Sequence, residues 1–506
     1  MPLWDSQMLV LFSLFILPLL FLFIRSSRSH LKSNFPPSPP RLPVIGNIHQ
    51  LGTLVHRSLR DLSEKYGPLM LLHLGQVPTL VVSSPEILQE IVKSHDIAFS
   101  NRPKTTAANI FCYGCKDLGF APYGEHWRQA RKLHALELLS LKRVQQFHFV
   151  REEEIALLVK RLRKASSSGD AINISDMVTA TSNNVVSRCI LGRRFEDENG
   201  ESRFGELTRK VMIDFMAFSV GDYFPKFWWI DVLRGFIGRL KKSFRELDTF
   251  FDQILEERKA KMKNGNGAHM KEDFVDILLR LQKDGMLDFP LAQDNIKGFL
   301  MDLFVGASDT TSTTLEWLMA ELVRNPRVMK KVQEDVRRVW GNKQDIDMND
   351  IHQMEYLTCV IKENLRLHPP LALLIARQTS ESLDVAGYNI PSKSTVFVNA
   401  WAIHRNPSLW DKPEEFLPER FENNPVDFKL WQDFQYIPFG LGRRGCPGLL
   451  FGLASTEYII ANLLYHFDWK LPDDNSKPDD LDMSEVYGLT VQRKVPLKLV
   501  PISYTL

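Results

Sequence analysis

The chain is poor in cysteine and carries almost no excess charge. Its 506 residues include five cysteines. Because the number is odd and the spacing irregular, no disulfide framework is implied, and a reducing compartment fits. Cys112 and Cys115 form a CxxC pair without a second pair, so we interpret both as structural. A net charge of +2 gives no indication of nucleic-acid binding. The remaining composition is that of an ordinary globular protein.

Long apolar runs are also scarce, and one of them approaches the length needed to span a membrane. Met8–Ile24 is a 17-residue run, and as a helix it would span about 26 Å, slightly less than the roughly 30 Å of a bilayer's hydrocarbon core. The run is followed by three basic residues, Arg25, Arg28 and Lys32. Positive charge after an apolar segment keeps the C-terminal side of that segment in the cytosol. We therefore expect residues 1–32 to be an uncleaved, single-pass anchor with the rest of the chain in the cytosol.

Proline is concentrated in one stretch after this run. Residues 33–43 contain five prolines, a composition that favours polyproline II and forbids helix. We interpret 33–43 as a stiff hinge and 44–506 as one domain, because the sequence shows no internal repeat and no second apolar anchor.

Periodicity predicts a mostly helical domain with a small amount of sheet. Leu69–Leu74 and Thr79–Ser83 flank a short turn and predict a hairpin, and further short strands are expected at 395–400 and 495–500. The segments with helical spacing are 86–94, 123–138, 142–165, 206–219, 237–263, 291–323, 326–340, 355–367 and 449–466.

The most informative cysteine lies near the C-terminus, in Phe439-Gly-Leu-Gly-Arg-Arg-Gly-Cys-Pro-Gly448. A lone cysteine cannot complete a zinc site of four N or S donors, whereas it can be the single thiolate ligand of a haem iron. The glycines allow tight turns that bring backbone N–H groups to the sulfur. Pro447 has no N–H, so we expect donors from Gly448 onward, where a helix N-terminus would stabilise a thiolate. The alternative is an inert, buried cysteine in a glycine-rich loop.

Taken together, Phe439, Gly442, Arg444, Cys446 and Gly448 resemble the haem-binding signature of the cytochrome P-450 monooxygenases. The resemblance extends from the proline hinge to the C-terminus. It implies haem b as the cofactor, with Cys446 as axial ligand of the iron and Phe439 and Arg444 beside the haem. It also implies the cytochrome P-450 fold, mainly α with a minor β part, preceded here by one N-terminal transmembrane helix.

The longest periodic segment, 291–323, carries Gly306-Ala-Ser-Asp-Thr-Thr-Ser-Thr-Thr314 in its middle. Hydroxyl side chains compete for backbone bonds inside a helix, so this stretch indicates either a functional site or a polar face packed on another polar surface. It resembles the dioxygen-binding part of the family's central helix, which implies that Thr310 helps to deliver protons and that Asp309 is the acidic relay. Ala307 stands where many members have glycine, and its methyl group is expected to narrow the dioxygen groove.

Two further groups of polar residues match the family. Glu363 and Arg366 share one helical face, and the resemblance adds Arg420 to form a buried cluster that holds the cysteine loop. The two haem propionates need cations and hydrogen-bond donors, a task that suits arginine. By resemblance, the residues that contact them are Trp127, Arg131, Arg377 and Arg444.

The resemblance also implies a substrate pocket made of separate, mostly apolar segments, and a hydrophobic small molecule as the substrate. The expected pocket residues are Ile110, Phe111, Gly306, Ala307, Leu373, Leu374 and Leu489. Segments 121–128, 401–407 and 487–490 are similar to the plant microsomal branch of the family. That branch oxidises specialised metabolites, and we expect a terpenoid ahead of a phenylpropanoid, coumarin or oxime.

The same branch lies in the endoplasmic reticulum membrane and receives electrons singly from a separate NADPH–cytochrome reductase. The resemblance therefore implies indirect use of NADPH, with the reductase, membrane lipid and an apolar substrate as partners and no nucleic acid. Arg128, Lys132 and Arg443 are the residues expected to form a basic docking face for the reductase.

Two alternative functions are open at this point. A haem-thiolate isomerase or dehydratase uses neither dioxygen nor a reductase, and the pairing of Asp309 with Thr310 argues against it. A non-catalytic, membrane-anchored haem or lipid-binding protein is the alternative from another class. The intact combination of Cys446, Thr310 and Asp309 argues against this second alternative as well.

Overall fold

The computed structural model of the chain describes residues 34–194, 203–263, 272–285, 290–343, 346–428, 431–473 and 477–504. The anchor expected at 1–32 lies outside these residues. Within the described ranges, no helix combines the length and the apolar character needed to cross a bilayer.

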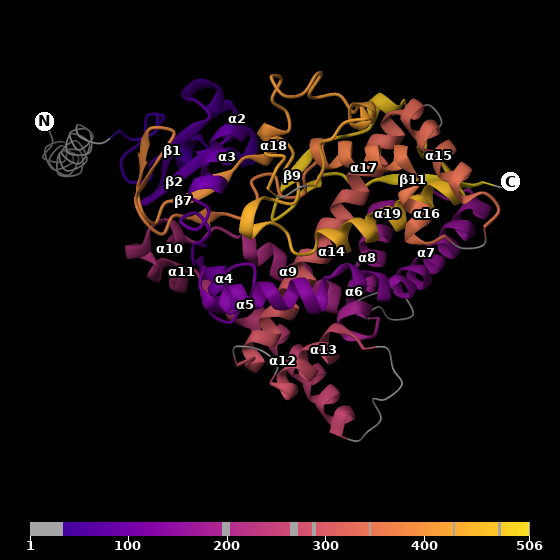
Figure 1. The fold of residues 1–506 in the computed structure, drawn as a ribbon, viewed down its shortest axis with the longest axis horizontal. Helices are drawn as coiled ribbons and strands as arrows, with labels where there is room; N and C mark the ends of the chain where they lie inside the picture. Colours follow the sequence, from indigo (N-terminus) through magenta and orange to yellow (C-terminus); the bar gives the residue numbers. More distant parts are fainter. Residues whose placement is uncertain are drawn as a thin grey trace, which may run out of the picture.

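The described part of the chain is mainly helical (Figure 1). Helices longer than one or two turns are α2 (Val55–Tyr66), α3 (Pro85–Ser94), α5 (Glu125–Leu133), α7 (His148–Ser168), α8 (Ile174–Leu191), α9 (Arg203–Met216), α12 (Phe236–Lys263), α13 (Phe274–Asp284), α14 (Gln293–Arg324), α15 (Pro326–Trp340), α17 (Glu355–Leu367) and α19 (Leu449–His466). Shorter helices are α4 (Thr106–Phe111), α6 (Leu141–Gln146), α10 (Val220–Tyr223), α11 (Trp229–Leu233), α16 (Met348–His352) and α18 (Ala400–Ile403).

Four small sheets complete the described fold. The largest has the strand order β1 (Leu69–Leu74), β2 (Val77–Val82), β7 (Thr395–Val398) and β4 (Arg377–Gln378), with β2 and β7 parallel and the other pairs antiparallel. A second sheet joins β3 (Ile172–Asn173), β11 (Lys498–Ser503) and β8 (Phe467–Lys470). Two antiparallel pairs are β5 (Leu383–Val385) with β6 (Tyr388–Ile390), and β9 (Glu485–Tyr487) with β10 (Val491–Arg493).

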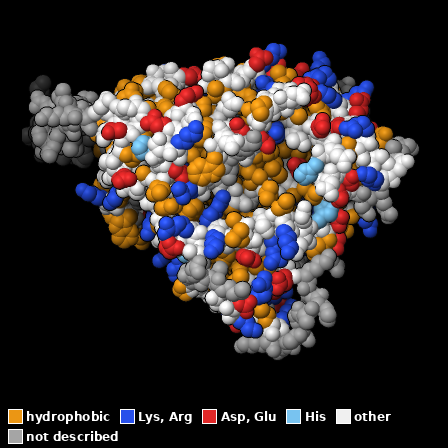
Figure 2. All heavy atoms as spheres, viewed as in Figure 1, with side chains coloured by type: hydrophobic (Ala, Val, Ile, Leu, Met, Phe, Trp, Pro, Cys, Tyr) orange, Lys and Arg blue, Asp and Glu red, His pale blue; other side chains and the backbone are white. Residues whose placement is uncertain are grey.

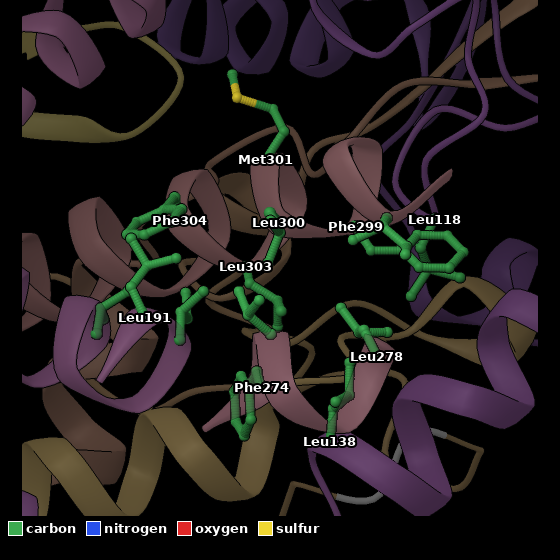
Figure 3. Packing of buried hydrophobic residues seen from close by; sticks show 14 of the residues in the cluster. Leu118, Leu138, Leu191, Phe274, Leu278, Phe299, Leu300, Met301, Leu303 and Phe304 are labelled. Carbon is green, nitrogen blue, oxygen red and sulfur yellow. The ribbon is translucent and has the colours of Figure 1, made fainter. Parts of the chain in front are cut away.

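Helix α14 runs through the middle of the molecule and packs against α8, α17, α19 and β10 (Figure 1). Figure 3 shows its apolar side chains meeting those of surrounding segments in one continuous core. Phe299 and Phe304 of α14 are both buried there, with Leu191 of α8 and Phe274 and Leu278 of α13. A helix buried on nearly all sides is apolar around most of its circumference, so the hydroxyl-rich stretch in its middle stands out from the rest.

Most of the expected elements are confirmed, and their limits differ where the backbone leaves the helical region. Residues 142–165 form two helices rather than one, because Phe147 has φ −91° and ψ 13° between α6 and α7. The helix expected at 123–138 begins after Gly124, which is extended, and continues beyond Leu133 as a π-helical turn at His134–Leu138. The last strand is displaced to Lys498–Ser503, where it pairs with both β3 and β8.

Helices α2, α8 and α13 are missing from the sequence-based prediction. The reason is clearest for α8, which buries Thr181, Ser182, Asn184 and Ser187 beside apolar side chains. A buried helix face of mixed polarity gives no amphipathic period, so its sequence does not resemble that of a surface helix.

The proline segment lies against the domain surface. The carbonyl of Pro37 accepts a hydrogen bond from the backbone N–H of Leu71 in β1 at 3.0 Å. The side-chain amide of Gln50 donates to the carbonyl of Pro40 at 2.9 Å. Prolines cannot donate, but their carbonyls still accept, so residues 34–43 are docked along the sheet at these points.

Candidate active site

Two glycines shape the loop that carries Cys446. Gly440 and Gly442 have φ of 73° and 62°, a left-handed conformation that favours glycine. Gly442 also has no room for a side chain, because a Cβ there would lie 2.7 Å from Oδ1 of Asp96. The backbone N–H of Cys446 donates to the carbonyl of Phe439 at 2.8 Å and closes the loop. Helix α19 begins directly afterwards at Leu449.

The surroundings of Cys446 act on its thiol in opposing directions. Burial raises the pKa of the thiol, while a hydrogen bond from the Gly448 backbone N–H and the positive charge of Arg131 lower it. These two influences favour the thiolate, the form that ligates metal. The expectation that donors begin at Gly448 therefore agrees with the geometry of the loop.

A large cavity lies between this loop and α14. It contains about 1800 Å³ of empty space, including the part open to solvent. Cys446, Phe439 and Gly445 line it from the loop, and Gly306, Ala307 and Thr310 line it from α14.

Four arginines line the same cavity and lie close enough for their charges to interact: Arg102, Arg131, Arg377 and Arg444. Burial and this mutual repulsion lower the pKa of Arg102 well below its ordinary value, and they lower the pKa of Arg444 to about 9. The Arg444 guanidinium lies 4.4 Å from the centre of the Trp127 ring. Its Nε donates to the carbonyl of Ser100 at 2.7 Å and its Nη2 to that of Ala121 at 2.5 Å.

The other arginines are oriented by backbone carbonyls in the same way. Arg131 donates to Gly445 at 2.8 Å and Arg377 to Leu441 at 2.5 Å, both within the cysteine loop. Carbonyls orient a guanidinium but bring no net negative charge. A buried cluster of this kind is stabilised by an anion with several acceptor oxygens.

The residues present fit a haem. The cavity combines a thiol that faces a backbone N–H and an arginine, apolar walls for a flat macrocycle, and four arginines, of which Arg377 already pairs with the carboxylate of Asp96. Cys446 is placed to ligate the iron, and the two propionates would satisfy the arginine cluster.

The second charged group is a buried cluster behind the cysteine loop. Glu363 accepts two hydrogen bonds from Arg366, at 2.8 and 2.9 Å, and one from Arg420 at 3.0 Å. Glu363 and Arg366 are fully buried. Arg366 also donates to the carbonyl of His404 at 2.7 Å, and His404 Nε2 accepts from the backbone N–H of Ile437, two residues before Phe439. The cluster therefore connects α17 to the start of the cysteine loop.

The two residues expected to handle protons face different neighbours. Thr310 lines the cavity, and its hydroxyl donates to the carbonyl of Gly306 at 2.7 Å, one turn earlier in α14. Asp309 faces β10 instead. Its carboxylate accepts from the hydroxyl of Thr490 at 2.5 Å and from the side-chain amide of Gln492 at 2.7 Å.

The structure brings some of the expected substrate residues into the cavity wall and leaves others behind it. Gly306, Ala307, Leu374 and Leu489 line the cavity. Ile110, Phe111 and Leu373 do not. Phe111 stacks on the cavity residue Phe215 with ring centres 5.6 Å apart, and Leu373 packs in a separate apolar cluster with β1 and β2.

Sequence reasoning missed two charged residues of the cavity, Arg102 and Asp302. Arg102 donates to the carbonyls of Ile375 and Ala376 at 2.6 and 2.7 Å. Asp302 of α14 accepts from the backbone N–H of Leu118 at 2.5 Å and shapes the 117–120 loop. An arginine directly before Pro103 is a weak sign of a fixed backbone, and the sequence carries no comparable sign for Asp302.

The cavity has a thiol-bearing loop on one side, a hydroxyl-bearing helix on the other, and an arginine cluster in its wall. This combination is that of a haem-thiolate protein. The sequence model of the cytochrome P-450 family matches residues 36–499, and the chain belongs to that family. A zebra fish cytochrome P-450 solved with progesterone has the same fold, with a TM-score of 0.76 over 88% of this chain and 99% of the other at 23% identity.

Plant enzymes are similar over almost the full length. The chain is 54% identical to a phenylacetaldehyde oxime monooxygenase from Prunus mume, over 98% of this chain and 96% of the relative. It is 47% identical to a desmethylyatein synthase from Sinopodophyllum hexandrum, over 98% and 99%. A costunolide synthase from Cichorium intybus is 44% identical over 98% and 97%. The chain is a haem-thiolate monooxygenase whose relatives act in plant specialised metabolism.

Proposed function

We propose that the chain oxidises an apolar, aromatic plant metabolite, with phenylacetaldehyde oxime as the first substrate to test and a terpenoid as the second. The 54% identity to an oxime monooxygenase supports this order, which reverses the one expected from sequence alone. The observation that carries the proposal is an aromatic pair in the cavity wall. The rings of Phe120 and Phe215 have centres 5.1 Å apart, and Leu374 and Leu489 line the same cavity. Aromatic faces of this kind favour a flat ring as ligand.

The residues of the chain divide the work of the reaction. When bound, haem supplies the redox chemistry that activates dioxygen. Cys446 holds the iron, and the arginine cluster orients the propionates. The apolar wall orients the substrate and excludes water, which protects the reaction from side paths. Thr310 lines the cavity from α14, and its hydroxyl accepts and donates protons there.

Electrons are proposed to arrive on the thiolate side of the molecule. Arg128 of α5 and Arg443 of the cysteine loop have side chains 56% and 44% exposed, and Lys132 of α5 completes the basic face expected for the reductase. Asp96 contacts Arg443 at 2.8 Å and the buried Arg377 at 3.7 Å. The docking face is thus joined to the propionate-binding arginines by one buried carboxylate.

Residues 44–506 are proposed to form one catalytic domain, held at the endoplasmic reticulum membrane by residues 1–32 and by an exposed apolar patch. The patch consists of Phe218, Phe227, Trp228, Trp229, Val232 and Leu233, which are all exposed. It lies at the lower left in Figure 2, where Figure 1 places α10 and α11. The turn of the β1–β2 hairpin lies between this region and the segment that follows the prolines. The backbone N–H of Gly75 donates to the carbonyl of Ile45, and that of Gln76 donates to the carbonyl of Tyr223 at the end of α10. Exposed apolar patches of this kind mark membrane or partner contacts.

The test is to express the full chain with a plant NADPH–cytochrome reductase and to supply phenylacetaldehyde oxime. We expect the reduced carbon monoxide complex to show the absorbance of a thiolate-ligated haem, and the oxime to be consumed only with NADPH and dioxygen. Turnover without NADPH would favour the isomerase or dehydratase alternative. Haem loading without oxidation of an oxime, a terpenoid or a phenylpropanoid would favour a non-catalytic binding protein.

A further inference from the structure

The carboxylate of Asp309 is separated from the cavity by a single side chain. Thr490 donates its hydroxyl to Oδ2 of Asp309 at 2.5 Å, and the same residue lines the cavity. Thr490 is 2% exposed, so water outside the protein does not reach its hydroxyl directly. Asp309 therefore meets the cavity through Thr490, whereas Thr310 meets it directly.

The position of this hydroxyl is fixed by the backbone around it. The N–H of Val491 donates to the carbonyl of Pro370 at 2.9 Å, and the carbonyl of Val491 accepts from the indole of Trp317 at 2.8 Å. The carbonyl of Thr490 accepts from Gly488 at 3.1 Å. These hydrogen bonds fix the start of β10 to α14 through Trp317, to the segment after α17 through Pro370 and to its own turn through Gly488. A fixed donor–acceptor geometry is what efficient proton transfer requires.

A polar stripe continues along α14 from this point towards solvent. Asp309, Thr313 and Glu316 are spaced by four and three residues, so they share one helical face. Thr313 donates to the hydroxyl of Thr490 at 3.3 Å. Glu316, with a side chain 12% exposed, accepts from Ser175 at 2.5 Å and lies 4.0 Å from Arg493 of β10. The seam between α14 and β10 is therefore polar along a stretch where most of α14 is apolar.

Both carboxyl groups in this seam are disposed to hold protons. Burial raises the pKa of Asp309, with hydrogen bonds from Thr490 and Gln492 acting against it. Burial also raises the pKa of Glu316, against a hydrogen bond from Ser175 and the charge of Arg493. A carboxyl of raised pKa is better matched to proton transfer near neutral pH than an ordinary surface acid.

We propose that the α14–β10 seam is a proton path into the cavity, in which the hydroxyl of Thr490 transfers protons between Asp309 and the cavity. The step requires that Asp309 takes up a proton and that the hydroxyl of Thr490 turns from Asp309 towards the cavity. The protonated carboxyl of Asp309 then gives its proton to Oγ1 of Thr490 as the hydroxyl proton of Thr490 leaves for an acceptor in the cavity. Solvent protons restore Asp309 by way of Glu316, and no electron moves along the seam. The inference rests on the proposed monooxygenase function and deepens it, because it gives Thr490 a catalytic role beside Thr310.

Replacement of one hydroxyl tests the path. Thr490→Val keeps the shape of the side chain and removes the proton carrier, whereas Thr490→Ser keeps the carrier. In the full-length, haem-loaded chain with reductase and phenylacetaldehyde oxime, we expect Thr490→Val to lower the product formed per NADPH severalfold and to raise peroxide release. Thr490→Ser should remain close to the unmodified chain. Thr181→Val is the matched control, because this buried hydroxyl of α8 bonds only a carbonyl of its own helix at 2.9 Å.

A measurement without turnover accompanies the assay. The infrared band of Asp309, identified by its loss in Asp309→Asn, should change frequency in Thr490→Val, because the carboxyl group loses a hydrogen bond whether it is protonated or ionised. It should stay in place in Thr490→Ser and Thr181→Val. If the unmodified chain does not oxidise the oxime, the substrate assignment fails while this band still tests the contact with Thr490, and an unmoved band overturns the path.

Gln492→Met separates transfer from simple positioning. This variant removes the other hydrogen bond to Asp309 and leaves the hydroxyl of Thr490 intact, so the loss of coupling should be smaller than in Thr490→Val. Equal losses in the two variants would overturn the inference, since Thr490 would then merely hold the carboxylate. Equal losses in Thr490→Val and Thr490→Ser would overturn it as well, because side-chain packing rather than the hydroxyl would be at fault.

Discussion

Cys446 differs from the other four cysteines by its neighbours rather than by its own chemistry. Cys112, Cys115, Cys189 and Cys359 are buried and free, and burial raises the pKa of each. Burial raises the pKa of Cys446 as well, but Cys446 has in addition a hydrogen bond from the backbone N–H of Gly448 that favours the thiolate. At the scale of single residues, function therefore depends on what the surrounding loop supplies.

Cys446→Ala should abolish the absorbance of thiolate-ligated haem in the reduced carbon monoxide complex, because the iron loses its protein ligand. Absorbance spectra of the purified full chain are the measurement. Cys359→Ala is the control, since this thiol is equally free but lies outside the cavity, and it should keep the spectrum. An unaltered spectrum in Cys446→Ala would falsify the assignment of the ligand.

Thr310→Ala should leave haem binding intact and lower the product formed per NADPH by on the order of tenfold, because one proton donor of the cavity is lost. NADPH, product and peroxide are measured together. Ser312→Ala is the matched control on the same helix, as its hydroxyl bonds the carbonyl of Asp309 at 3.1 Å and does not line the cavity. Tight coupling in Thr310→Ala would remove this residue from proton delivery.

Charged side chains connect the elements that carry the site. The buried Glu363 of α17 binds Arg366 of the same helix and Arg420 in the 3-10 turn Pro418–Phe421. Glu363→Gln should destabilise the protein by about 3–5 kcal/mol, because two buried arginines lose their counter-charge. Urea unfolding followed by circular dichroism measures this loss. Glu334→Gln, in a pair with Lys330 whose side chains are 67% and 81% exposed, should cost far less, and equal costs would contradict a special role for the cluster.

A second charged contact connects β9 to α2, between Glu485 and the side chains of His56 and Arg57. Burial by itself would raise the pKa of Glu485, but hydrogen bonds and charge from His56 and Arg57 outweigh it and lower the pKa to about 2. A depressed carboxyl pKa stabilises the fold above the ordinary value near 4.5, and this contribution is lost as the pH falls towards 2.

Glu485→Gln should remove this acid-dependent part, worth up to about 3 kcal/mol. The unfolding free energy of the unmodified chain should therefore fall more steeply with acid than that of the variant between about pH 4.5 and pH 2. Unfolding curves at several pH values provide the comparison. Glu64→Gln, at an exposed pair of α2, should keep the steep fall. Parallel curves for Glu485→Gln and the unmodified chain would show that the contacts of Glu485 with His56 and Arg57 do not cause the loss of stability in acid.

Two helices show what the sequence pattern could and could not predict. Helix α15 begins at Pro326 and ends at Trp340, as its spacing predicts, because it has a buried side and a charged side. Helix α8 buries polar groups on several sides, where it packs against α14, α7 and α13. The π-helical turn at His134–Leu138 likewise depends on what it packs against.

At the scale of the whole molecule, we expect the exposed apolar patch around α11 to contact lipid. In proteoliposomes, brominated lipid should quench part of the tryptophan fluorescence of the full chain, and Trp228→Phe with Trp229→Phe should remove much of that fraction. These rings are 61% and 46% exposed. Trp340→Phe is the control, because that ring is buried, and it should leave the quenched fraction unchanged. Undiminished quenching in the double variant would place the membrane contact elsewhere.

By itself, the sequence predicted Cys446 as the haem ligand and determined the central helix and the family, because these depend on residues that lie close together in the chain. Cys446 and Gly448 are two residues apart, and the hydroxyl stretch of α14 is continuous. The tertiary structure alone decided which charges share the cavity. Arg102 and Arg444 are separated by 342 positions and meet only after folding. The same holds for Asp309 and Thr490, 181 residues apart, since hydrogen bonds at such separations follow from packing and leave no local pattern.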